Sequence, residues 1–302
     1  MEQIYEKLTK IAGHTRELTN TTDKMGLDAI NENLGTVVSD VNTQDDLIEQ
    51  IAAALDGKVG GNPEMEDGLV TGEITEYANR RVTTVASYAF YYKNIKLIDL
   101  PACTYIGSSA FFHCEALERA IFPECVYINN GAFSNCSKLT SAVFPACSSI
   151  GSYAFYYCQD LTSIYFPTCT HVGSSAFATC TSLESFILPA VSTVGPSAFS
   201  GCTKLTTADF GGNNSVNTIY SYAFYNCKSL STLILRYSSL ATLNATTAFM
   251  NTPLSSSTYL GYFGSIYVPS SLVEIYKSAT NWTAYADRIT AITEDELNGG
   301  EG

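Results

Sequence analysis

The sequence has little positive charge and no long hydrophobic run. Its 302 residues include 16 lysines and arginines against 29 aspartates and glutamates, which gives a net charge of −13 at pH 7. Nucleic acid and anionic lipid both bind proteins through basic footprints, and no basic stripe is present, so we expect neither as a partner. No apolar run approaches the ~18 residues that a membrane-spanning helix needs, so we expect no membrane insertion.

Sequence motifs of catalysis and metal binding are missing as well. The three histidines stand far apart, at positions 14, 113 and 171, and none has a second ligand at metal-binding spacing. The sequence contains no Cys-x-x-Cys, Gly-x-Ser-x-Gly, His-Glu-x-x-His or phosphate-binding loop. We therefore predict a protein that is not an enzyme, with no catalytic residue, cofactor or metal.

What the sequence does contain is a unit of about 22 residues repeated eight times. The unit reads Leu-x-x-Ile-x-Phe-Pro-x-Cys-x-x-Ile-Gly-x-x-Ala-Phe-x-x-Cys, best seen over residues 139–158 and 161–180. The phenylalanine of its Ala-Phe pair stands at Phe90, Phe111, Phe133, Phe155, Phe177, Phe199, Phe224 and Phe249. A period of this length predicts a solenoid, in which each unit forms one coil.

The order of residue types in the unit predicts the structure of one coil. Leu161, Ile164 and Phe166 alternate with polar residues and should face inward from a short strand, which Pro167 ends. Glycine then follows a second apolar residue in several units, and we expect it to adopt backbone angles that a Cβ atom would forbid. The phenylalanines should form one interior column, in which central positions contribute more stability than Phe90 or Phe249 near the ends.

All 10 cysteines fall into this register. Six lie three residues after the phenylalanine and four lie two residues after the proline, so each has its like in the next coil, about 4.8 Å away and parallel. Parallel side chains cannot form a disulfide framework or converge on zinc. We expect two ladders of buried free thiols.

This unit resembles that of the BspA-like leucine-rich repeat family, over roughly residues 68–292. The resemblance implies a solenoid of mainly β/α-β repeats, that is, a leucine-rich-repeat-like right-handed coil with a parallel sheet. It also implies a terminal cap from Ser265 onward. It also implies recognition of other molecules, not their transformation, because relatives occur on bacterial and protist cell surfaces and in bacteriophage tail genes. Units after Phe199 depart from the pattern: they have 25 residues, and Gly211 replaces the proline.

The first 58 residues differ in kind, with no repeat and with helical spacing of apolar residues at Ile4, Leu8 and Ile11. We expect a small α-helical region at 1–58 for attachment or oligomerisation, a linker at 59–68, the solenoid at 69–264, a cap at 265–292 and an acidic flexible tail at 293–302. Helices so short cannot bury their apolar stripes alone, so we expect a homo-oligomer that deletion of 1–58 converts into a monomer. Two or three strands are both compatible with the stripes, and a trimer is what a phage-fibre resemblance implies.

A second, shorter resemblance concerns residues 8–25. Leu8-Thr-Lys-Ile-Ala12 and Thr21-Thr-Asp-Lys-Met25 are similar to a module near the start of tail proteins from phages and prophages of Firmicutes. Met1 to Glu6 show neither the basic segment nor the apolar core of a signal peptide, so export by the ordinary route is not expected if Met1 is the native start. The resemblance implies a virion tail assembled in the cytoplasm, where unpaired cysteines persist. An extracellular or cell-surface location is the alternative.

Two surfaces are candidates for binding. The first is the solvent-facing side of the strands, an apolar column beside a small polar one, with the candidates Arg119, Ile121, Val143, Tyr165, Ile187 and Asp209. The second flanks the Ala-Phe turns and is rich in tyrosine, with the candidates Tyr153, Tyr156, Tyr157 and Tyr225. Ordinary sheet surface explains the first equally well, and shielding of the phenylalanine column explains the second.

The sequence thus predicts a recognition protein, with two hypotheses for its setting. One is a tail-fibre-like component of a phage or prophage, whose solenoid binds a host surface protein or glycan and whose residues 1–58 bind other tail components or copies of the chain. The other is a bacterial cell-surface adhesin of the same fold.

Overall fold

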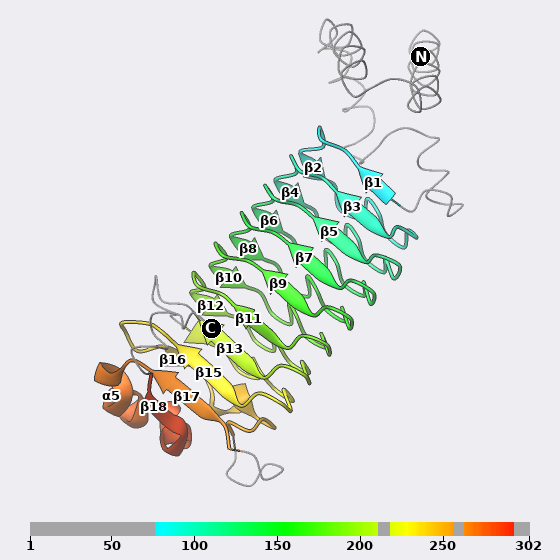
Figure 1. The fold of residues 1–302 in the computed structure, drawn as a ribbon. Coiled ribbons are helices and arrows are strands. Elements are labelled where there is room, and N and C mark those ends of the chain that lie inside the picture. Colours follow the sequence, from blue (N-terminus) through cyan, green and yellow to red (C-terminus); the bar gives the residue numbers. More distant parts are fainter. Residues whose placement is uncertain (1–75, 211–217, 256–262, 293–302) are drawn as a thin grey trace, which may run out of the picture. The chain divides into compact units, whose positions relative to one another are not determined.

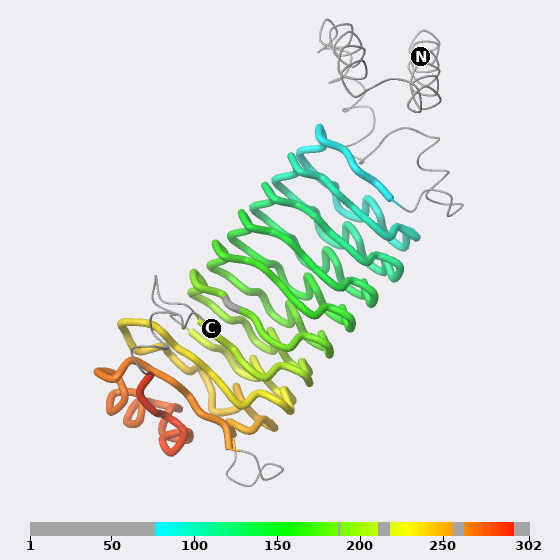
Figure 2. The backbone as a smooth tube through the Cα atoms, in the orientation of Figure 1, coloured from blue at the N-terminus to red at the C-terminus, as the bar shows by residue number. Residues whose placement is uncertain are grey.

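A computed structural model describes residues 76–210, 218–255 and 263–292, all within the compact unit Gly57–Gly302 (Figure 1). The predictions for residues 1–58, 59–68 and 293–302, including the helices and the oligomer, lie outside the described residues. Within them the chain winds as a parallel β-solenoid, and Figure 2 shows the backbone repeating the same course from one coil to the next. The predicted repeat solenoid with a parallel sheet is confirmed.

Each coil contributes one longer strand. These strands form two five-stranded parallel sheets, one after the other along the solenoid. The first sheet consists of β1 (Glu76–Ala78), β3 (Leu97–Asp99), β5 (Arg119–Ile121), β7 (Ser141–Val143) and β9 (Ser163–Tyr165). The second consists of β11 (Ser185–Ile187), β13 (Thr207–Phe210), β15 (Thr232–Leu235), β17 (Ser265–Val268) and β18 (Ile289–Ala291).

A two-residue strand follows on the second side of each coil. These strands build one eight-stranded parallel sheet, in the order β16-β14-β12-β10-β8-β6-β4-β2. They are β2 (Thr84–Val85), β4 (Tyr105–Ile106), β6 (Tyr127–Ile128), β8 (Ser149–Ile150), β10 (His171–Val172), β12 (Thr193–Val194), β14 (Thr218–Ile219) and β16 (Thr242–Leu243). Equivalent repeat positions pair across coils, as Val172 does with both Ile150 and Val194, so the register follows the sequence repeat.

The Ala-Phe turn forms the third side of the coil. The amide of Phe155 donates to the carbonyl of Ala176 in the next coil at 2.7 Å, and this bond recurs along the turns, so they stack without being strands. All eight phenylalanines are buried. Neighbouring rings of the column are parallel within 10°, with centroids 4.9 to 5.5 Å apart. The predicted aromatic column is therefore present.

A second phenylalanine ladder comes from the ends of the longer strands. Phe122, Phe144 and Phe166 stack on one another and meet the first column edge to face, as Phe144 does with Phe155 at 6.0 Å and 71°. Leu161 and Phe166 are fully buried as the alternation predicted, and Ile164 is partly buried. The interior is thus two interlocking aromatic ladders surrounded by aliphatic residues and thiols.

The prediction for the repeated glycines is wrong. Left-handed backbone angles among the described glycines occur at Gly131 and Gly201, not at Gly107, Gly151 or Gly195. A Cβ atom on Gly151 would instead lie 2.7 Å from backbone atoms of Asn129 and Asn130 in the preceding coil. Close approach between coils, not backbone torsion, therefore favours glycine there.

Left-handed angles belong instead to the residues two before and two after most of the phenylalanines. Around Phe155 they are Tyr153 and Tyr157, with φ of 58° and 62°. Apart from glycines they are Tyr88, Tyr92, Ser109, His113, Asn135, Tyr153, Tyr157, Ser175, Thr179, Ser197, Tyr222, Asn226 and Asn251. L-residues, and β-branched or bulky ones above all, avoid this conformation, so each coil holds local strain at its turn.

Thr179, with φ of 65°, gives a direct test of this strain. Replacing it by Asn, the residue at the same position in three other coils, should raise the free energy of unfolding by about 0.5–1 kcal/mol, because asparagine tolerates left-handed angles better than threonine. Urea denaturation measures the change. Thr193→Asn in β12 is the control and should lower stability, since asparagine is disfavoured in strands. A loss in both variants would contradict strain at Thr179.

The last coil is closed by a cap. The last Ala-Phe turn is η1 (Thr246–Phe249), and the cap that follows comprises η2 (Ser270–Leu272), the helix α5 (Val273–Ser278), η3 (Trp282–Arg288) and β18. Trp282 is fully buried against Phe249, and its indole Nε1 donates to the carbonyl of Ala241 at 2.7 Å. The Tyr276 hydroxyl accepts a hydrogen bond from the Ala241 amide at 2.8 Å. The cap therefore covers the end of the aromatic column and occupies backbone groups that a further coil would otherwise use.

Candidate recognition surfaces

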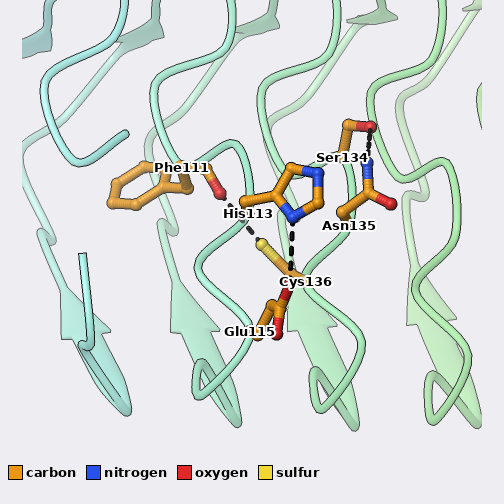
Figure 3. Close-up of polar contacts among 6 residues, drawn as sticks. All are labelled: Phe111, His113, Glu115, Ser134, Asn135 and Cys136. Atoms are coloured by element: carbon orange, nitrogen blue, oxygen red, sulfur yellow. Dashed lines mark hydrogen bonds and ion pairs between the residues drawn. The ribbon is translucent and has the colours of Figure 1, made fainter. Parts of the chain in front are cut away.

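The ten thiols are interior groups, not a surface site. All are free and buried, as predicted. In the ladder next to the turns, Cys136 Sγ donates to the carbonyl of Phe111 in the preceding coil at 3.1 Å, a bond repeated by the other five (Figure 3). In the other ladder, Cys147 Sγ donates to the carbonyl of Ser149 at 3.4 Å. The thiols thus satisfy backbone carbonyls within and between coils.

Alkaline pH should destabilise this packing. Burial raises the pKa of the Cys114, Cys147 and Cys169 thiols to about 12, whereas an unfolded thiol titrates near 8.5. The folded state keeps protons that the unfolded state loses, so the free energy of unfolding should fall as pH rises from about 8.5 toward 12, by up to ~1.4 kcal/mol per thiol and pH unit.

Urea denaturation at pH 7, 9 and 10.5 measures this loss. Cys147→Ala removes one such thiol and should flatten the alkaline slope by its share. A stability that does not change above pH 9 would contradict the thiol ladders.

The first candidate surface lies on the longer strands. Register places Asp99, Ile121, Val143 and Tyr165 side by side in consecutive strands, with Val143 and Tyr165 exposed. Arg119 is exposed in the adjoining polar column. Ile187 pairs through its backbone with Asp209 in the second sheet, and its side chain is not described. The structure thus brings together Arg119, Ile121, Val143 and Tyr165, and places Ile187 and Asp209 on the following sheet.

Asp209 forms an ion pair with Arg236, the residue that follows the neighbouring strand β15. Arg236 donates to both carboxylate oxygens of Asp209, with Nε 3.0 Å from Oδ1 and Nη2 3.0 Å from Oδ2. Both side chains are largely buried. Such bidentate pairing fixes the carboxylate in place. Asp209 is therefore a structural group of the irregular coils, and sequence analysis missed its partner because the pair spans 27 residues and falls outside the repeat pattern.

The second candidate surface is the outer side of the Ala-Phe turns, which we call the turn face. It comprises residues 86–92, 107–113, 129–135, 151–157, 173–179, 195–201, 220–226 and 245–251. Three of these segments carry tyrosines on both sides of the phenylalanine. The predicted Tyr153 and Tyr157 are exposed and Tyr156 is half-buried, and Tyr225 is half-buried beside the exposed Tyr222.

The tyrosines form three clusters of touching rings. In the first, Tyr91 stacks on Phe112 at 5.2 Å and Tyr92 stacks on His113 at 4.7 Å, while Tyr88 meets Tyr91 edge to face. The second joins Tyr153, Tyr156 and Tyr157, and the third joins Tyr222 and Tyr225.

Sequence analysis missed His113 as a member of the first cluster. Its Nδ1 lies 3.0 Å from Glu115 Oε1 (Figure 3). The signal available in the sequence was its position, the same distance after Phe111 as Tyr92 is after Phe90.

Shielding of the phenylalanine column does not explain these tyrosines. Phe133, Phe177 and Phe199 are fully buried in coils that carry no turn tyrosine. The residues Tyr88, Tyr92 and Tyr153 are 61%, 58% and 51% exposed. Because the column is equally buried without them, the exposed rings are available to another molecule.

The turn face carries no fixed charge. Its eight segments contain no aspartate, glutamate, lysine or arginine, and His113 is their one ionisable group apart from the tyrosine hydroxyls. Residues 76–292 as a whole hold 11 basic and 10 acidic residues, so the net charge of −13 comes from the chain on either side of them. The charge of the whole chain therefore does not describe the solenoid, whose turn face is polar but uncharged.

Two further observations concern membrane-spanning helices and metal sites among the described residues. No helix among them is both long and apolar enough to cross a membrane. They also hold no group of three or more histidine, cysteine, aspartate or glutamate side chains placed to bind a metal ion.

Comparisons with known proteins agree with this architecture. The family described as "BspA type Leucine rich repeat region" matches residues 75–168 and 148–283, in 6 copies. No curated protein matches the chain.

Several solved structures are similar to the chain. A leucine-rich repeat protein of T. pallidum is 25% identical, with a TM-score of 0.40 over 52% of this chain and 75% of that one. A leucine-rich cell surface protein of Faecalibacterium prausnitzii is 16% identical, with a TM-score of 0.24 over 68% and 86%. An internalin of Listeria monocytogenes is 13% identical, with a TM-score of 0.39 over 82% and 74%.

The family match includes every coil of the described solenoid and reaches into the cap, and the coils have the strands, turns and stacked interior that its repeat predicts. The chain belongs to the BspA-type leucine-rich repeat family.

Proposed function

We propose that this is a non-enzymatic recognition protein that binds a cell-surface molecule through the turn face of its solenoid. The observation that carries the proposal is the exposure of three tyrosine clusters that the fold does not need for burial. Tyrosine offers a large flat contact surface with a hydroxyl for hydrogen bonding, and few rotatable bonds are ordered on binding. A long stack of coils also offers many such contacts to one partner.

The setting we favour is the bacterial cell surface or the extracellular space, as an adhesin-like protein. The chain belongs to the BspA-type family. Relatives of that family on bacterial and protist cell surfaces are what supports this placement. The phage-tail hypothesis depends on residues 8–25, which lie outside the described residues, and on relatives in bacteriophage tail genes, and it stays a prediction. Attachment, self-association or binding of tail components through residues 1–58 stays a prediction.

Binding of the fluorescently labelled full chain to intact cells tests the proposal. Flow cytometry would compare bacterial cells with cultured epithelial cells. The turn-face variant carries Tyr→Ser at 88, 91, 153, 156, 222 and 225 and Tyr→Asn at 92 and 157. Serine and asparagine already occur at these repeat positions in other coils, so the variant should fold.

We expect the chain to bind one of the cell types and the turn-face variant to lose at least tenfold in affinity. A double variant, Tyr105→Ser with Tyr127→Ser, removes two exposed tyrosines of the short-strand sheet and should bind normally. If no cell surface is bound, the proposal fails. If instead Val143→Ser with Tyr165→Ser abolishes binding, the site lies on the longer strands.

A further inference from the structure

The tyrosine clusters recur at every third coil. The segment Ser-Tyr-Ala-Phe-Tyr-Tyr occupies 87–92 and again 152–157, and Ser-Tyr-Ala-Phe-Tyr-Asn occupies 221–226. Their phenylalanines belong to the first, fourth and seventh Ala-Phe turns, so two turns without tyrosine lie between successive tyrosine-bearing turns. At ~4.8 Å per coil, the clusters are spaced about 14–15 Å apart along the turn face.

Most of the turns between the tyrosine-bearing turns are small and polar. At the positions that the tyrosines occupy, the second turn has Ser109 with Phe112 and His113, which stack on Tyr91 and Tyr92 and so extend the first cluster over two coils. The third turn has Gly131, Ser134 and Asn135. The fifth and sixth turns have Ser175, Ala178, Thr179, Ser197, Ser200 and Gly201. The turn face therefore alternates flat aromatic platforms with hydroxyl and amide groups, and its tyrosines recur at every third coil.

Backbone geometry gives an independent reason to assign the tyrosines a binding role. Tyr88, Tyr92, Tyr153, Tyr157 and Tyr222 all have left-handed angles, with φ between 57° and 63°. Bulky side chains are genuine outliers in this region, and most other coils fill the same positions with serine, asparagine or glycine, the exceptions with left-handed angles being His113 and Thr179. An exposed tyrosine on a strained backbone contributes little to the stability of the fold. Its presence at these positions therefore indicates a role in binding.

We propose that the turn face binds an extended, neutral polysaccharide that lies along the solenoid, with a sugar ring stacked on each tyrosine cluster; this inference rests on the proposed function. The apolar faces of sugar rings stack on aromatic side chains, and sugar hydroxyls pair with serine, threonine and asparagine. A polymer of repeating units matches a surface that repeats every three coils. The positions of the three clusters set where the sugar rings stack and how far apart the stacked rings lie.

The charge of the turn face decides against other polymers. Single-stranded nucleic acid also stacks on aromatic rings, but it needs a basic groove along its backbone. An acidic polysaccharide needs compensating cations in the same way, and the turn face has no lysine or arginine. A protein partner favours one continuous apolar patch, whereas polar turns separate the tyrosine clusters: the third turn lies between the first and second clusters, and the fifth and sixth turns lie between the second and third.

Three linked weak contacts should produce strong dependence on ligand length. One sugar stacked on one cluster binds weakly, but a chain that reaches a second cluster binds there intramolecularly, at a high effective concentration. Oligosaccharides long enough to span three coils should therefore bind at least tenfold more tightly than those confined to one cluster.

Affinity gel electrophoresis of the full chain is the test. The probes are soluble neutral polysaccharides, namely mixed-linkage β-glucan, xyloglucan, galactomannan, α-mannan and dextran, with hyaluronan and alginate as acidic controls. We expect at least one neutral polymer to retard the chain, equally at about 50 and 500 mM NaCl because no charges attract it. Replacing the cluster at 153–157 should weaken retardation by at least tenfold, and the turn-face variant should migrate freely. Tyr105→Ser with Tyr127→Ser should be retarded like the parent.

Treatment of the cells separates this proposal from the function it rests on. Periodate cleaves vicinal diols of glycans, and it should abolish cell binding, while protease treatment of the cells should not. If the turn-face variant loses cell binding, but protease removes the receptor and no neutral polymer retards the chain, the ligand is a protein and the polysaccharide proposal is overturned. Retardation that persists in the turn-face variant also overturns it.

Discussion

Phe155→Ala should lower the free energy of unfolding by about 3–5 kcal/mol. The ring is fully buried, stacks on Phe133 at 5.2 Å and on Phe177 at 5.1 Å, and meets Phe144 and Phe166 edge to face. Truncation leaves a cavity bordered by both aromatic ladders, and neither ladder can collapse into it without losing its stacking. Urea denaturation followed by circular dichroism measures the effect.

The ends of the column give matched comparisons. Phe90 contacts Phe111 and Tyr77, so Phe90→Ala should cost less than Phe155→Ala. Position in the repeat also predicts a small loss at Phe249, but that ring packs against Phe224 and Tyr285, so we now expect a loss close to that at Phe155. Tyr127→Ala, at an exposed ring, should change stability by less than about 0.5 kcal/mol. Equal small losses at Phe155 and Phe249 would contradict the stacked column.

Trp282→Ala should be about as damaging, at 3–5 kcal/mol, and its effect should be local. The variant removes the ring that covers Phe249 and leaves the Ala241 carbonyl without its indole donor. Because each coil is stabilised mainly by its neighbours, loss of the cap should loosen the last coils first. Hydrogen exchange should show faster exchange in β15 and β17 than in β5.

Trp282→Phe separates the two contributions, since it keeps an aromatic ring but loses the donor. We expect it to cost about 1–3 kcal/mol, and Ile275→Ser on the exposed side of α5 to be nearly neutral. Uniform acceleration of exchange along the whole solenoid would show that the cap does not act as an end closure.

The repeat made most of the fold predictable. Eight copies of one pattern show which residues face inward, so the strand at Ser163–Tyr165, the phenylalanine column and both thiol ladders follow from the spacing. Gly151 was misjudged because a single sequence shows that glycine is needed but not whether torsion or a neighbouring coil requires it. The Asp209–Arg236 pair could not be predicted, since it arises where coils lengthen and the register changes.

The candidate site was only partly visible in the sequence. Tyr153, Tyr156, Tyr157 and Tyr225 were identified from their place beside the Ala-Phe turns. Whether they shield the column or face a ligand depended on the burial of Phe133 and its counterparts, which only the structure supplies. The strain at their backbones is likewise a property of the folded turn.

Footprinting of tyrosines tests the central claim most directly. The full chain would be iodinated with and without the cell-surface material or polysaccharide that it binds, and each tyrosine quantified by mass spectrometry. The account predicts protection at the exposed tyrosines of the turn face, Tyr88, Tyr91, Tyr92, Tyr153, Tyr157 and Tyr222, and unchanged labelling at Tyr105, Tyr127 and Tyr165. Protection at Tyr165 or Tyr127 with none on the turn face would contradict it.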